Sequence, residues 1–163
     1  MIFDAFLLLS GAIGPGSGAM SGQAANGAGS ILSTNTIDVG PLLLGANQNT
    51  DLGAGSSLQL AVRVLSAPTV GTSVQFQIIH ADDASLTSNL QVLAQTDAIP
   101  IAALPAGTQV VVALPSPAPY PVKRFVGARY INVGAIATAS YFAGLVLDAQ
   151  SPSTNFRTGY AIA

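Results

Sequence analysis

The 163-residue sequence contains no cysteine, no tryptophan and no glutamate, and its only histidine is His80. The absence of cysteine excludes disulfides, thiol catalysis and thiolate metal sites. Acid–base chemistry would fall on seven aspartates and four tyrosines, and neither a Gly-x-Ser-x-Gly motif nor a phosphate-binding glycine loop is present. We therefore predict that the protein is not an enzyme and needs no cofactor.

Charge is also scarce, because only 7% of the residues are charged, whereas an ordinary soluble domain has about 25%. Five basic residues against seven acidic ones cannot form the basic surface that binds nucleic acid by releasing counterions. A surface with so few charges also favours association with other protein over a monomer free in solution. The composition predicts a protein in permanent contact with other protein, without a nucleic-acid partner.

Long apolar runs are missing as well. No uninterrupted stretch reaches the ~18 apolar residues of a membrane-spanning helix. The apolar start of the chain carries Asp4 where a signal peptide has lysine or arginine. We expect neither a signal peptide nor a membrane partner.

The N-terminal part is apolar and rich in glycine. Residues 11–30 contain seven glycines and no charge. This composition fits a flexible linker, and it also fits an arm that becomes ordered on a neighbouring subunit. In the second case the apolar contact would come from the start of the chain, namely Ile2, Phe3, Phe6 and Leu7–Leu9. We expect residues 1–29 to form an extended arm and residues 30–163 to form one domain with a short C-terminal tail.

The rest of the chain has the period of β-strands. Leu60, Val62 and Val64 alternate with Arg63, and Val74, Phe76 and Ile78 alternate with glutamines. Glycine and proline interrupt the apolar stretches at short intervals. The expected strands cover residues 30–39, 57–65, 73–80, 89–95, 99–104, 108–114, 122–133 and 135–147. This pattern predicts an all-β protein, a jelly-roll-like sandwich of about eight strands.

One polar cluster follows an expected strand. His80 is followed by Asp82 and Asp83, and Ser85, Thr87 and Asn89 lie close behind. Oxygen ligands of this kind suit calcium, although calcium needs 6–8 of them. The simpler interpretation is a polar strand end whose aspartates cap a loop, and we predict no metal site.

Three of the five basic residues fall close together, at Lys123, Arg124 and Arg129. They fit a solvated strand edge, where basic residues discourage wrong pairing. They fit equally an electrostatic surface that docks on an acidic partner. Alternation places Arg129 and Tyr130 on opposite faces of their strand.

Several segments together resemble a known family. They are residues 33–40 (Ser-Thr-Asn-Thr-Ile-Asp-Val-Gly), 99–100 (Ile-Pro) with 104–107 (Leu-Pro-Ala-Gly), 120–134, and 145–148 (Leu-Val-Leu-Asp). These segments are similar to those of tailed-bacteriophage capsid cement proteins, a family first recognised in a podovirus that infects Bordetella.

The resemblance implies a jelly-roll protein without catalytic residues. Such a protein would be a dimer or trimer on the outer surface of the capsid in the virion, bridging subunits of the major capsid protein. The alternative is a β-sandwich module of a phage fibre or tail that binds a receptor or carbohydrate. The absence of tryptophan and the scattered tyrosines count against a sugar platform.

Overall fold

The computed structural model describes residues 5–40, 58–115, 122–147 and 149. Among these residues the chain forms strands and two short 3₁₀ turns, with no α-helix. The turns are η1 (Ala5–Leu7) and η3 (Ile101–Ala103). The strands are β1 (Leu8–Ser10), β2 (Ala12–Ile13), β3 (Met20–Ser21), β4 (Gln23–Ala24), β5 (Gly27–Leu32), β6 (Ile37–Asp38), β7 (Gln59–Thr69), β8 (Ser73–Ala81), β9 (Gln91–Gln95), β10 (Ile99–Pro100), β11 (Gln109–Ala113), β12 (Phe125–Ile136) and β13 (Thr138–Val146).

Two antiparallel sheets form the sandwich. The first has the order β1-β13-β7-β11, with β4 also on β13, and the second has the order β10-β8-β12-β5, with β6 on β12 and β9 on β8. The pairs β1/β4, β5/β6 and β9/β10 each follow one another along a single partner strand. Each pair therefore acts as one interrupted strand.

Counted in this way, the sandwich has eight strand positions in chain order. The first position pairs with the eighth, the second with the seventh, the third with the sixth and the fourth with the fifth. This nested pairing is a long antiparallel hairpin rolled into two sheets, which is the jelly roll. The predicted fold class is confirmed.

The core lies between the sheets and consists of the apolar residues that alternation directs inward. Its centre is an aromatic cluster formed by Phe76 from β8, Tyr130 from β12 and Tyr141 from β13, with ring centroids 5.0–5.7 Å apart. The Tyr130 hydroxyl donates a 2.7 Å hydrogen bond to Ser10 Oγ, so the buried hydroxyl has a partner. Burial raises the pKa of Tyr130 and also that of Tyr141, the latter to about 12. The hydroxyl groups of both tyrosines therefore stay neutral.

The N-terminal segment differs from the predicted extended arm, because β1, β4 and the start of β5 pair with β13 and β12 of their own chain. Leu9 and Ala25 have no exposed surface, and Ser10 contacts the central aromatic cluster. The glycines here allow irregular strands. Gly27 and Gly29 have φ values of 98° and 86°, which only glycine adopts at little cost. Because these strands pair with β12 and β13, the domain begins before the boundary expected at residue 30. Composition alone does not distinguish such a strand from a linker.

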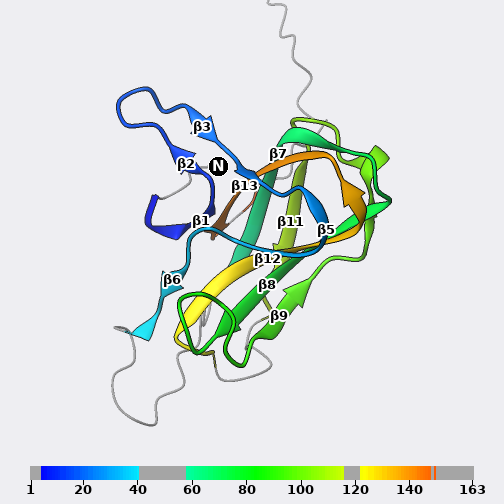
Figure 1. Ribbon diagram of the computed structural model, residues 1–163. Helices are drawn as coiled ribbons and strands as arrows, with labels where there is room; N and C mark the ends of the chain where they lie inside the picture. Colours follow the sequence, from blue (N-terminus) through cyan, green and yellow to red (C-terminus); the bar gives the residue numbers. More distant parts are fainter. Residues whose placement is uncertain (1–4, 41–57, 116–121, 148, 150–163) are drawn as a thin grey trace, which may run out of the picture.

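A small hairpin interrupts the first strand position. After β1 the chain leaves the sheet, forms the β2–β3 hairpin and returns as β4 on the same partner strand. Figure 1 shows this hairpin projecting from the sandwich beside β13. Its tip, residues 14–19, has no charge and is mostly exposed.

The two ends of the sandwich differ. We call the end with residues 25–26, 70–72 and 133–137 the turn end, where the described connections are tight. We call the opposite end, with residues 38–40, 82–90 and 122–124, the loop end. In Figure 1 the turn end is on the right and the loop end is at the lower left.

Candidate interaction surface

The loop at residues 82–90 is organised by Asp83. One carboxylate oxygen of Asp83 accepts hydrogen bonds from the backbone N–H groups of Thr87 (2.9 Å) and Ser88 (2.7 Å), and the other accepts from Thr87 Oγ1 (2.9 Å). These bonds, led by the one from Ser88, lower the pKa of Asp83 below its usual value. The interpretation of this aspartate as a loop cap is confirmed.

The same loop carries an apolar anchor on the outer face of the second sheet. Leu86 is 1% exposed and packs with Ile79 and Ala81 in a cluster separate from the main core. Gly127 on β12 leaves the space for it, because a Cβ there would lie 2.3 Å from Leu86 Cδ1. The backbone at Leu86 has φ 57°, a strained value for leucine. Apolar burial and the Asp83 cap together hold this conformation.

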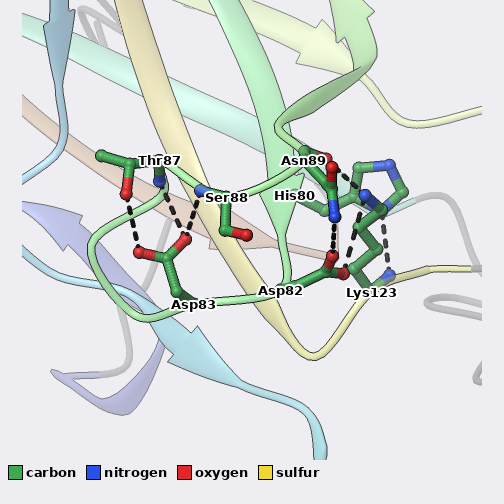
Figure 2. A network of polar contacts seen from close by, with 7 residues as sticks. All are labelled: His80, Asp82, Asp83, Thr87, Ser88, Asn89 and Lys123. Atoms are coloured by element: carbon green, nitrogen blue, oxygen red, sulfur yellow. Dashed lines mark hydrogen bonds and ion pairs between the residues drawn. The ribbon is translucent and has the colours of Figure 1, made fainter.

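Beside the loop, a polar network joins three segments at the loop end, as Figure 2 shows. The Lys123 backbone N–H donates a 2.9 Å hydrogen bond to His80 Nδ1, and Lys123 Nζ donates to the Asn89 carbonyl. Lys123 Nζ also lies 3.6 Å from an Asp82 oxygen, and Asn89 Nδ2 donates to Asp82 at 2.7 Å. Burial, and then the positive charge of Lys123, lower the pKa of His80. A neutral ring agrees with an Nδ1 that accepts a hydrogen bond.

Arg124 forms a second ion pair at the loop end. Its Nε and Nη2 atoms donate to the two oxygens of Asp38, both at 2.9 Å, a bidentate geometry that suits a guanidinium and a carboxylate. The hydrogen bond from Arg124, followed by that from the Gly40 N–H, lowers the pKa of Asp38. Arg124 also lies over the Phe125 ring, 5.0 Å from its centroid.

Arg129 is placed differently from the other two basic residues. It lies partly buried on the outer face of β12, while Tyr130 beside it is fully buried in the core, so the predicted alternation is confirmed. Its Nε atom donates a 2.6 Å hydrogen bond to Gln77 Oε1 on β8. The two Nη atoms have no hydrogen-bond partner among the residues that the structure describes, and Arg129 forms no ion pair there.

The structure describes five of the seven predicted interface residues, and these five have different environments. Ile2 and Phe3 lie outside the described residues. Leu7 is partly buried against the core, while Phe6 is 90% exposed. Of the three basic residues, Lys123 and Arg124 have carboxylate partners within the chain, and Arg129 has none in the described part.

Sequence reasoning did not identify two further surface features. At the turn end, Val70 and Val133 are 65% and 50% exposed. On the outer face of the second sheet, Gln77 donates to Gln95 across strands. Alternation does place Gln77 outward, but it carries no information on which residues become neighbours between strands.

In the described ranges, no group of three or more histidine, cysteine, aspartate or glutamate residues is arranged to hold a metal ion. No helix in the described part of the chain is long and apolar enough to cross a membrane.

The fold places the chain in the jelly-roll class, which includes viral capsid proteins, lectins and cupins. A sequence model of the Bbp16 family matches residues 20–146, most of the chain, and the chain belongs to this family. The name indicates a Bordetella bacteriophage protein, so the phage origin expected from the resemblance is supported. No curated protein matches the chain.

Proposed function

We propose that this protein is a capsid cement, or decoration, protein of a bacteriophage. It binds the outer surface of the capsid in the virion, oligomerises as a dimer or trimer, and bridges subunits of the major capsid protein to stabilise the shell. The observation that carries the proposal is the membership of a phage protein family over residues 20–146, together with the jelly-roll fold.

The distribution of charge supports a role in assembly. The described ion pairs at the loop end lie within the chain, and the turn end exposes Val70 and Val133 without a charged residue in residues 70–72 or 133–137. Interface cores are depleted of charged residues. A surface with few unpaired charges loses little hydration when another protein covers it.

Cementing of this kind depends on many modest contacts. Apolar surface removed from water contributes about 25 cal/mol per Å², reduced by the cost of ordering the partners. Repeated subunits on a shell increase the effective concentration of each contact. This mechanism requires contact area and no catalytic group, so a small, weakly charged jelly roll suits it.

The test is sedimentation of the purified protein with undecorated phage shells. The proposal expects saturable binding in a fixed ratio to the major capsid protein, together with shells that resist heat better. Shells already decorated serve as the control and should bind no more protein. A protein that stays in the supernatant, or that binds oligosaccharides or host cells instead, would contradict the proposal in favour of a receptor-binding module.

A further inference from the structure

Of the described basic residues on and next to β12, Arg129 is the one without an acidic side chain as a partner. Lys123 and Arg124 have Asp82 and Asp38 beside them. Among the described residues Arg129 has a single side-chain hydrogen bond, from Nε to Gln77, and no carboxylate partner, although burial is sufficient to lower its pKa. A partly desolvated cation without a counter-ion costs free energy in the isolated protein.

The guanidinium of Arg129 is held in place by a row of side chains across four strands. Register places Leu32, Arg129, Gln77 and Gln95 side by side on β5, β12, β8 and β9. Gln77 Nε2 donates to Gln95 Oε1 at 2.7 Å and to Gln75 Oε1 at 3.3 Å. These two bonds fix the Gln77 amide, so that its oxygen faces Arg129.

This arrangement leaves the outer side of the guanidinium for a ligand. Nε is occupied, and the two Nη atoms carry the remaining donors. Leu32 is the register partner of Arg129 on β5, and Ile131 lies two residues along β12; both side chains are partly buried. A guanidinium held by its Nε and bordered by apolar side chains is prepared for a planar anion.

We propose that the outer face of the second sheet, centred on Arg129, docks a carboxylate side chain of a partner protein. The inference rests on the proposed function, in which that partner is the major capsid protein. Both the charge and the planar shape of the guanidinium complement a carboxylate. Phosphate of nucleic acid is a poorer occupant, because five basic residues in the chain do not provide the several contacts that phosphate binding requires.

The experiment compares three variants in the shell-binding assay. Arg129→Gln removes the charge, and Arg129→Lys keeps the charge but removes the planar fork. Arg63→Gln is the matched control. Arg63 lies on β7 of the other sheet, also partly buried and also without a carboxylate partner among the described residues. Thermal unfolding of each variant verifies that the fold is retained.

The expected result is at least a tenfold weaker affinity of Arg129→Gln for undecorated shells. Arg129→Lys should bind with intermediate affinity, and Arg63→Gln should bind like wild type. Equal binding of wild type and folded Arg129→Gln would overturn the inference and leave the proposed function standing. An equal loss in Arg63→Gln would also overturn it, because the effect would then be one of net charge. Failure of the wild-type protein to bind shells would overturn the proposed function as well.

Discussion

The turn end and the loop end close the same sandwich by different physical means. The turn end is closed by glycine turns and apolar contacts, with Val70 and Val133 exposed and no charged residue within residues 70–72 or 133–137. The loop end carries two ion pairs and the capped loop at residues 82–90. Yet the most deeply buried side chain of that loop is Leu86, so the loop end also depends on apolar burial.

The largest effect is expected from Leu86→Ala at the loop end. The substitution removes buried apolar surface and leaves a cavity beside Gly127, so the free energy of unfolding should fall by about 2–5 kcal/mol. Chemical denaturation measures this change. Leu147→Ala is the matched control, since Leu147 is 63% exposed and should tolerate the change. A small loss for Leu86→Ala would show that the polar bonds hold the loop.

The second effect concerns Gly134 at the turn end. Gly134 has φ 82°, and a Cβ there would lie 2.9 Å from Gly71 Cα. Gly134→Ala should therefore lower the free energy of unfolding by about 1–3 kcal/mol through strain and contact together. Gly16→Ala separates the two causes, because Gly16 has φ 80° and no atom within 4 Å of its Cβ position. Equal losses in both variants would mean that the contact with Gly71 contributes nothing.

A smaller and opposite effect is expected from Val70→Asn. Val70 has φ 59° and a mostly exposed side chain, and asparagine tolerates this conformation better than a β-branched residue. The variant should be more stable by about 1 kcal/mol, measured by the same denaturation curves. Val133→Asn, with an exposed valine outside the left-handed region, should show no such gain. A loss of stability in Val70→Asn would indicate that its side chain packs more than its exposure suggests.

The smallest effect at neutral pH is expected from His80 at the loop end. In the unfolded chain His80 binds a proton near pH 6.5, whereas in the fold burial and Lys123 lower its pKa. Stability should therefore be complete above pH 6.5 and decrease as the pH falls from there toward the lowered pKa. His80 is the only histidine, so His80→Gln should flatten the dependence between pH 5 and 6.5. An NMR titration of His80 that gives a pKa above 6.5 would contradict this.

Much of the fold could be predicted from the sequence, because alternation is a local property. Val74, Phe76 and Ile78 point into the core, as their spacing from Gln75 and Gln77 predicts. For strands in this order, the rules of chain connection leave few possible topologies, and the nested pairing is one of them. The predicted strand at residues 99–104 is shorter in the structure, because the chain turns into η3 after Pro100.

The surface could be predicted less well, because partners across strands depend on register. Spacing in the sequence grouped Lys123, Arg124 and Arg129, but it did not indicate that Asp82 and Asp38 compensate the first two. The glycine-rich start was wrongly separated from the domain for a related reason. Its strands are short and irregular, and they are stabilised by β12 and β13, more than a hundred residues away.

The interrupted strands limit how the sheets of neighbouring copies can associate edge to edge. Sheet edges with continuous unpaired backbone are templates for unwanted growth, and many proteins guard them with lysine. This chain has a single lysine, but three of its four sheet edges in the described residues are broken, by the β2–β3 hairpin, by the gap between β5 and β6, and by the gap between β9 and β10. Among the described residues, the remaining edge position, β11, is not interrupted, but it is only five residues long. Copies concentrated side by side thus find short edge segments for fibril-like addition rather than long ones.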